Sequence, residues 1–198
     1  SWFITLTIQS IVSCCLITLA TTQVFQYSTT SAIFIFFFSF SLSVIMFSFL
    51  CSTFFSRAKS AAILGTLLFF ATYFPYYAVS DPAFAQSTKL LVSLFAPSAF
   101  ALGAGVVANF EGGQIGITPD TYTAISDNFS YFDAVFMMLF DALLYGLLAW
   151  YLGQVLPSEY GTQKPWHFPL TGFVASVKGF FESGDDGNDG NDGNDGYD

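Results

Sequence analysis

The stretch that decides the fold is AIFIFFFSFSLSVIMFSFLCSTF, residues 32–54, which contains no charged side chain. A helix needs about 20 apolar residues to cross the hydrocarbon core of a bilayer, and a soluble domain has no reason to keep such a stretch free of charge. The first charged residue of the chain is Arg57, so residues 1–56 share this character. The sequence therefore predicts an integral membrane protein.

Further apolar runs on both sides of this stretch predict three more membrane-spanning helices. The hydrophobic fraction of 54% and the aromatic fraction of 20% agree with several spans. Within the first stretch, the phenylalanine block 34–38 predicts that much of the helix surface faces lipid. We therefore expect an all-α transmembrane domain over residues 1–156, with about four spans at residues 2–24, 32–54, 61–79 and 132–152.

Residues 84–107 include part of another apolar run, but Pro97 interrupts it and Gly103 and Gly105 follow. Proline removes a backbone hydrogen bond and clashes with the preceding turn, so two short helices are favoured over one long helix. We therefore expect a re-entrant or interfacial helical hairpin. Basic residues prefer the cytoplasmic side of a membrane. A hairpin that does not cross places Lys89 on one side and groups four basic residues with the C-terminal tail on the cytoplasmic side: Arg57, Lys59, Lys164 and Lys178.

The net charge of −9 belongs mainly to the C-terminal end of the chain. Seven of the 14 acidic residues lie within residues 182–198, where Gly-Asn-Asp repeats. Glycine with like-charged aspartate cannot bury enough apolar surface to fold, so this segment is expected to be a disordered linker. Residues 157–181 are expected to be a cytoplasmic segment that precedes it. A calcium loop is the alternative, but the repeat lacks the acid spacing and the bidentate glutamate of such loops.

The polar segment 111–130 is expected to form an extracytoplasmic or lumenal loop, because it contains glycines, a proline and scattered acids. It carries one sequon for N-glycosylation, with Asn128 as the acceptor. This sequon directly precedes the next predicted span, where an acceptor is poorly accessible. Asn128 is therefore a candidate glycosylation site with restricted access.

The notable ionisable residues of the last span are Asp133 and Asp141, and Tyr145 follows one turn after Asp141. The two carboxylates are eight residues apart and fall on one helix face. Because an ionised carboxylate in hydrocarbon is expensive, Asp141 is expected to face the protein interior or water. It would then bond a hydroxyl of a neighbouring span, or act in a translocation path or conformational switch. An aspartyl protease needs two carboxylates that converge from different helices, which this spacing does not provide.

Motifs for catalysis and cofactor binding are absent from the sequence. The chain has no Gly-x-x-x-x-Gly-Lys-Ser/Thr loop for phosphates, no Ser-His-Asp set and no zinc-ligand spacing. We therefore expect no catalytic residue, cofactor or metal in this chain, and no nucleic acid among its partners. The residues alone indicate a polytopic membrane domain in contact with membrane lipids.

Several blocks of the sequence resemble the A subfamily of ABC transporters. STFFSRAKSAA at residues 52–62 resembles a cytoplasmic turn of that family, and LFAPSAFALG at residues 94–103 resembles its helical hairpin. The most specific likeness is the path from the last membrane helix toward the nucleotide-binding domain. It consists of LYGLLAWYL at 144–152, VLPSEYG at 155–161 and KPWHFP at 164–169.

This resemblance covers about residues 1–170, with Ser158 where the family usually has glycine and His167 where an aromatic residue is usual. It implies an ATP-driven transporter, commonly of lipids or sterols, built from two six-helix domains and two ATPase domains. The chain would be the C-terminal part of one ABC-2 type transmembrane domain, without its first two helices, the extracytoplasmic domain and the ATPase domain. ATP and Mg²⁺ would bind that ATPase domain. The implied partners are nucleotide-binding domains and a second transmembrane half.

The resemblance also implies which residues of this chain contact the ATPase domain: Arg57, Lys59, Tyr160, Gly161, Pro165 and Trp166. From the residues alone, two other hypotheses stay open. One is a small multispanning channel or ion-coupled carrier that uses Asp141, and the other is a membrane scaffold that transports nothing.

Overall fold

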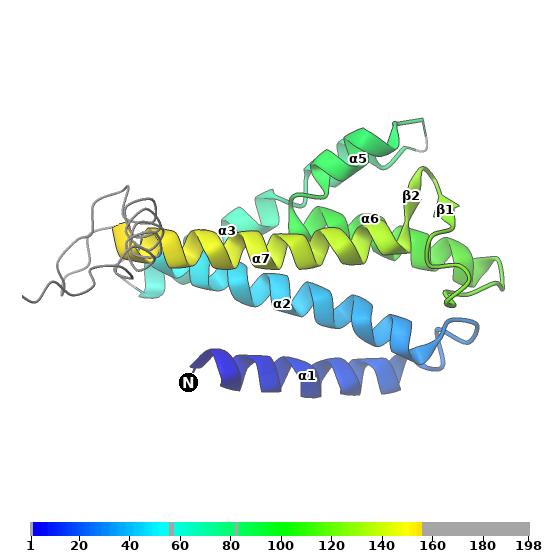
Figure 1. The fold of residues 1–198 in the computed structure, drawn as a ribbon, viewed down its shortest axis with the longest axis horizontal. Coiled ribbons are helices and arrows are strands. Elements are labelled where there is room, and N and C mark those ends of the chain that lie inside the picture. Colours follow the sequence, from blue (N-terminus) through cyan, green and yellow to red (C-terminus); the bar gives the residue numbers. More distant parts are fainter. Residues whose placement is uncertain (1, 56–57, 82, 156–198) are drawn as a thin grey trace, which may run out of the picture. The chain divides into compact units, whose positions relative to one another are not determined.

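The computed structural model describes residues 2–55, 58–81 and 83–155, and these residues are mainly helical (Figure 1). The predicted cytoplasmic segment 157–181 and linker 182–198 lie outside the described residues. Among the residues described, four stretches are long and apolar enough to cross a membrane: Phe3–Thr21, Thr30–Phe54, Lys59–Val79 and Tyr131–Val155. The prediction of an all-α membrane domain with about four spans is confirmed.

The long helices are α1 (Trp2–Thr21), α2 (Thr30–Phe54), α3 (Ala58–Ala71) and α7 (Tyr131–Val155). The third span is not one continuous helix. A turn at residues 72–74 separates α3 from the short helix α4 (Pro75–Val79). Because proline has no N–H to donate but fits the first turn of a helix, Pro75 ends the preceding helix and starts a new one.

The helical hairpin around Pro97 consists of α5 (Gln86–Val92) and α6 (Ala96–Gly112). The break between the two helices lies at residues 93–95, and Pro97 occupies the first turn of α6, where its missing N–H would have had no helical partner. The hairpin is therefore present as predicted, but α6 continues past residue 107 to Gly112.

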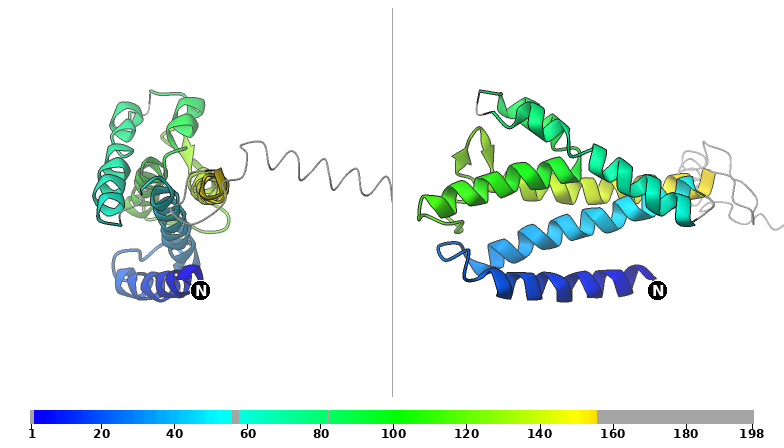
Figure 2. Two further views of the ribbon diagram at one scale, coloured as in Figure 1. Left: turned by 90° about the vertical axis from the view of Figure 1, so that its left-hand side faces the viewer. Right: turned by 180° about the vertical axis from the view of Figure 1, so that it is seen from behind.

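The centre of the domain is the pair formed by α2 and α7, which run parallel and side by side (Figures 1 and 2). Near the start of both helices, the Tyr131 hydroxyl donates a 2.7 Å hydrogen bond to the carbonyl oxygen of Ala32. Near their other end, a Cβ on Gly146 would lie 3.2 Å from the sulfur of Met46. Both pairs join residues 99 or 100 positions apart, so the register between the helices is constant along their length.

The phenylalanine block 34–38 faces the protein more than the sequence predicts. Phe36 is buried, and its ring stacks on Phe100 of α6 with centroids 5.0 Å apart. Phe40 stacks on the same ring at 4.2 Å. Only 22% of the α2 window is buried inside the domain, which agrees with the prediction that much of the helix surface faces lipid. The block nevertheless contributes Phe36 to the core, because α2 is apolar all round. Such a helix carries no polar face from which to tell its lipid side from its protein side.

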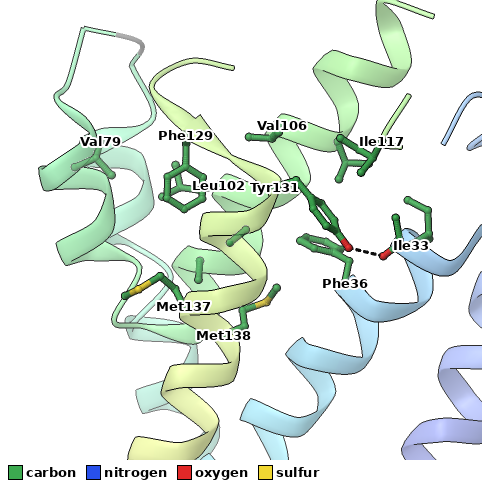
Figure 3. Close-up of a cluster of buried hydrophobic side chains, with 14 residues drawn as sticks. Ile33, Phe36, Val79, Leu102, Val106, Ile117, Phe129, Tyr131, Met137 and Met138 are labelled. Carbon is green, nitrogen blue, oxygen red and sulfur yellow. Dashed lines mark hydrogen bonds between the residues drawn. The ribbon is translucent and has the colours of Figure 1, made fainter. Parts of the chain in front are cut away.

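A glycine lets α6 approach this pair closely. A Cβ on Gly103 would lie 2.6 Å from both the Ala134 Cβ and the Phe36 ring. Small residues at helix contacts let backbones approach within a membrane, where packing rather than exclusion of water drives association. Figure 3 shows the resulting cluster, in which Met137 and Met138 of α7 and Leu102 of α6 complete the core.

The outer surface of the long helices is apolar. Only 6% of the residues in the best window of the third span, and 22% in those of α2 and α7, are buried inside the domain. The exposed side chains include Leu19, Leu67 and Leu143, which are 66%, 59% and 62% exposed. A bilayer is the solvent that such a surface fits, and the chain is a multi-pass membrane protein.

One end of the bundle carries a polar layer, which we call the cap and define as residues 22–29 and 111–130. Glu111, in the last turn of α6, accepts hydrogen bonds from the Tyr27 N–H at 2.8 Å and the Ser28 hydroxyl at 2.6 Å. The Ser28 hydroxyl oxygen in turn accepts a 2.9 Å bond from the backbone N–H of Ile117. These bonds tie the loop between α1 and α2 to the segment that follows α6.

The cap also contains a small β-hairpin that the sequence analysis describes only as loop. Strand β1 (Ile125–Ser126) pairs antiparallel with β2 (Phe129–Ser130). The two residues between them, Asp127 and Asn128, have φ angles of 53° and 57°. Tight hairpin turns need positive φ at both central positions, and Asp and Asn tolerate it.

Candidate functional site in the membrane-spanning bundle

Asp141 lies in the middle of α7 and is 0% exposed. Both of its carboxyl oxygens are buried, and neither has a hydrogen-bond partner among the described residues. The expectation that Asp141 bonds a hydroxyl of a neighbouring span is therefore wrong. A buried polar group without a partner is rare, and each case in a native protein calls for an explanation.

The helix register explains why no hydroxyl serves this carboxyl. The constant offset between α2 and α7 places Asp141 level with Ser41 and Leu42. The Ser41 hydroxyl lies 3.4 Å from the sulfur of Cys14 on α1. Ser43 is buried, but its hydroxyl donates to the carbonyl oxygen of Phe40 at 2.8 Å. The buried Ser39, one turn earlier, has its hydroxyl bonded in the same way within α2, at 2.7 Å. Serine in a helix readily bonds the carbonyl three or four residues earlier, so these hydroxyls are occupied within their own helix.

Tyr145 lies one turn after Asp141 and is also buried. Its hydroxyl donates a 3.1 Å hydrogen bond to the carbonyl oxygen of Leu94, in the turn of the helical hairpin. Its ring packs edge-on against Phe47 of α2, with centroids 5.6 Å apart. Tyr145 therefore joins three parts of the domain: α7, α2 and the turn between α5 and α6.

Asp133 has different surroundings. Its backbone N–H donates to the Ser130 hydroxyl at 3.0 Å, while its Oδ2 accepts a 3.3 Å bond from the Ser130 N–H. This reciprocal pair resembles a capping box and satisfies donors at the start of α7. Gln86 of α5 also donates to Oδ2 at 2.9 Å. No hydrogen bond joins Asp133 to the buried carboxyl of Asp141, so the described residues contain no carboxylate dyad.

A groove of about 380 Å³ lies between α2 and α3. Its wall is mostly apolar and includes Val44, Phe47, Cys51, Ala62 and Phe69. No group of three residues suited to hold a metal ion occurs in the described ranges. The groove is therefore suited to bind an apolar group such as an acyl chain.

The remaining predicted residues divide between described and undescribed parts. Lys59 is exposed in the first turn of α3. Asn128 lies in the β-hairpin turn, and its side-chain amide donates to the carbonyl oxygen of Phe84 at 3.3 Å. The other predicted ATPase contacts lie outside the described residues: Arg57, Tyr160, Gly161, Pro165 and Trp166.

Sequence reasoning missed two buried or bonded charges at the cap end. The sequence analysis used Lys89 only to assign the sides of the membrane, and did not predict that its side chain is buried. Burial raises the pKa of Glu111, but the Ser28 hydroxyl and the backbone N–H groups of Tyr27, Gln26 and Ser28 outweigh it and lower that pKa below its ordinary value. A signal was present for Lys89, since it is the sole basic residue between Lys59 and Lys164.

Comparison with known proteins finds relatives over most of the chain, although no protein-family model matches it. The chain is 40% identical to the retinal-specific phospholipid-transporting ATPase ABCA4 of Bos taurus over 179 residues, 86% of this chain and 8% of that protein. It is 38% identical to the phospholipid-transporting ATPase ABCA3 of Mus musculus over 82% of this chain and 10% of that protein. The chain belongs to the A subfamily of ABC transporters. ATP-binding cassette sub-family A member 2 of Homo sapiens is a further relative, 35% identical over 86% of this chain.

Membership in the ABCA subfamily confirms the family that the motifs indicate. The chain spans about a tenth or less of the length of the relatives that it matches.

Proposed function

We propose that this chain forms membrane-spanning helices of an ATP-driven transporter that moves phospholipids or similar hydrophobic substrates. The observation that carries this proposal is the 40% identity, over 86% of the chain, to a relative named as a phospholipid-transporting ATPase. The apolar outer surface of α1, α3 and α7 and the groove between α2 and α3 support it, because both suit contact with lipid.

ATP does not fit the residues of this chain. A phosphate-binding loop needs backbone N–H groups and a lysine that reaches the phosphates, and the sequence contains no such motif. We therefore assign ATP and Mg²⁺ to nucleotide-binding domains, and a complete transport path to this chain together with a second transmembrane half. The contribution of this chain is the shape of the path and its response to those domains.

Asp141 is our candidate for the residue that responds to a conformational change. A buried carboxyl without a partner raises the free energy of the observed state. A shift of α7 along α2 that brings a serine hydroxyl of α2 to the Asp141 carboxyl would provide the missing hydrogen bond. A conformation in which that bond forms would be stabilised relative to the one observed, by about 1 kcal/mol or more.

The orientation that follows from the basic residues places Lys59 in the cytoplasm and the cap on the opposite side. On this basis the turn before α3 is a candidate contact to a nucleotide-binding domain, together with Arg57 and residues 157–168. A Lys59→Cys variant of the full-length protein should crosslink to that domain, whereas Asp120→Cys in the cap should not. Equal crosslinking from both positions would contradict the orientation.

The transport proposal is tested with full-length protein in proteoliposomes that contain a fluorescent phospholipid. ATP should increase translocation of the lipid between leaflets, and Asp141→Asn, which keeps the volume but removes the acid, should slow translocation at least several-fold. Ion flux without ATP that disappears in the same variant would instead support an ion-coupled carrier. Absence of both lipid translocation and ion flux in folded protein would support the scaffold hypothesis.

A further inference from the structure

A buried cation lies beside the cap, on the short helix α5. The side chain of Lys89 is 1% exposed and is the largest of the fully buried side chains in the described part of the domain. Its ammonium donates a hydrogen bond to the backbone carbonyl oxygen of Asp127. An ammonium has three N–H donors, and a buried charge is costly unless it is paired and hydrogen-bonded. The Asp127 carbonyl oxygen accepts from only one of these three donors.

A cavity of about 210 Å³ opens at this lysine. A single water needs roughly 10–15 Å³ on a comparable measure, so the cavity has room for a small polar group. Five further polar residues contribute to its wall, from α4, its C-cap, α6 and the β-hairpin: Tyr76, Ser80, Asn109, Ser126 and Asp127.

The same wall carries a negative charge that does not neutralise the lysine. The side-chain amide of Asn109 donates to Oδ2 of Asp127 at 2.7 Å and to the Ser126 hydroxyl at 3.0 Å. Although the Asp127 backbone bonds Lys89, no ion pair between Lys89 and a carboxylate is found within the described ranges. The cavity therefore presents a cation and an anion as separate groups.

We propose that this cavity binds a phosphate group that bears a short cationic arm, the chemistry of a zwitterionic phospholipid headgroup. Phosphate oxygens would accept charge-assisted hydrogen bonds from the Lys89 ammonium, and hydroxyls such as that of Ser126 would add donors. The cationic arm would face the carboxylate of Asp127. A simple anion would leave that carboxylate without a counter-charge, so the zwitterion is the better match.

The surroundings of the cavity favour a membrane lipid over a soluble molecule as its source. Tyr76 belongs to a cluster of tyrosine rings with Tyr73 and Tyr77, whose centroids are 5.4 to 5.6 Å apart. Tyrosine is enriched where the bilayer meets water, the depth of the headgroups. Leu91 on α5 is 68% exposed and Phe95, which follows it, is 40% exposed. Acyl chains next to the headgroup would contact these side chains.

Binding at this cavity does not require transport, so its failure is distinguishable from failure of the proposed transport. The test uses full-length protein in detergent and measures dissociation constants from the rise in melting temperature with ligand concentration. Four ligands are compared: phosphatidylethanolamine, phosphatidic acid, diacylglycerol with the same chains, and soluble phosphoethanolamine. Phosphatidylethanolamine should bind most tightly, phosphatidic acid more weakly, and diacylglycerol at least tenfold more weakly than phosphatidylethanolamine.

Variants then test the separate roles of the Lys89 ammonium and the Asp127 carboxylate. Lys89→Met, which keeps the length of the side chain without its ammonium, should weaken binding of both phosphate-bearing lipids at least tenfold. Asp127→Asn should remove the preference for phosphatidylethanolamine over phosphatidic acid, while Asp120→Asn, a change at another exposed acid of the cap, should not. The melting curve of each variant without lipid shows whether it is folded.

Three results would overturn the proposal. Equal binding of diacylglycerol would show that the chains alone are recognised, and unchanged binding in folded Lys89→Met would exclude the lysine. Phosphoethanolamine that binds as tightly as the lipid and displaces it would reject the membrane as the source and leave a site for a soluble zwitterion. If Lys89→Met does not fold, the Asp127→Asn arm decides: retention of the full lipid preference would then reject the proposed cavity.

Discussion

Lys89 and Asp141 are both buried, at 1% and 0% exposed, but their surroundings differ. Lys89 has a carbonyl partner and lies in the wall of a polar cavity beside the cap. Asp141 lies in the bundle, where neither carboxyl oxygen has a described partner. The cap is thus organised by directional hydrogen bonds, whereas the bundle is organised by the packing of rings and small residues. The same depth of burial comes with a hydrogen-bond partner beside the cap and without one in the middle of the bundle.

This difference predicts how each region responds to substitution. Where a structure depends on hydrogen bonds, removal of a partner leaves another group unsatisfied and costs its full desolvation. Where a polar group has no partner, its replacement by an apolar side chain of similar volume costs little or stabilises. Substitutions in the cap should therefore destabilise the protein, whereas removal of the carboxyl in the bundle should stabilise it.

The largest effect is expected at Gly116 in the cap. Its φ is +70°, and a Cβ there would lie 2.1 Å from the carbonyl oxygen of Tyr27. Gly116→Ala combines a strained conformation, worth about 1–3 kcal/mol, with an overlap that only a backbone shift can relieve. We expect a loss of at least about 3 kcal/mol, measured by denaturant unfolding of the full-length protein in detergent.

Gly112→Ala is the matched control for this substitution. Gly112 ends α6, and a Cβ there would meet nothing within 4 Å. Alanine favours the helix over glycine by up to about 1 kcal/mol, so this variant should be neutral or slightly more stable. Similar losses in both variants would show that the cap is not held closely at Gly116.

The next effect has the opposite sign and concerns the bundle. Asp141→Leu removes a buried carboxyl without a described partner and should stabilise the protein by about 1–3 kcal/mol. Asp141→Asn keeps a polar group of nearly the same shape and should gain much less. Both are measured as shifts in thermal unfolding. A loss of stability in both variants would mean that the carboxyl has a partner in the folded protein, and would break the comparison between the two regions.

A smaller effect is expected where the two regions meet. Tyr131→Phe removes the hydroxyl that bonds the Ala32 carbonyl oxygen and joins the starts of α7 and α2. Because the ring and its packing remain, the loss should be about 1 kcal/mol. Tyr27→Phe is the control, since Tyr27 is 46% exposed and its contact with Glu111 uses the backbone N–H. A loss in Tyr131→Phe no greater than in this control would show that the hydrogen bond adds nothing to the packing.

The sequence was sufficient for the bundle as a set of helices, and less so for its interior. Uncharged runs of about 20 residues identify spans, because the bilayer fixes their length, and Pro97 locates the hairpin because of its missing N–H. The sequence did not show which side of α2 faces the protein, since Phe34 and Phe36 are equally apolar. That choice depends on complementary surfaces, such as Gly103 opposite Phe36.

The candidate polar groups were harder to predict, for a related reason. Asp141 was identifiable as unusual, but its lack of a partner depends on where the hydroxyls of Ser39 and Ser43 point. A serine hydroxyl in a helix can bond a carbonyl oxygen of its own helix or a group on a neighbouring helix. The sequence does not show which of these two bonds forms. The burial of Lys89 depends on the β-hairpin, whose Asp127-Asn128 turn was a readable signal of positive φ angles.

The smallest effect concerns Glu111, where burial and hydrogen bonding oppose each other. Burial raises the pKa of this carboxyl, but donors from Ser28, Tyr27 and Gln26 lower it below the ordinary value of 4.5. A group whose pKa is lower in the folded state stabilises the fold above its unfolded pKa. That contribution is lost as the pH falls through the folded pKa. We therefore expect cap stability to be constant at neutral pH and to decline below about pH 4.5.

The amount should be under about 1 kcal/mol, because the carboxylate is partly exposed and solvent screens its interactions. Hydrogen-exchange protection of the Tyr27 and Ile117 amides, compared between wild type and Glu111→Gln, isolates this carboxyl from other acids. The variant should lose protection at neutral pH and show a smaller further loss in acid. If protection in the wild type instead increases as the carboxyl becomes protonated, burial outweighs the four donors. The cap would then resemble the bundle in burying a carboxyl that its surroundings do not stabilise.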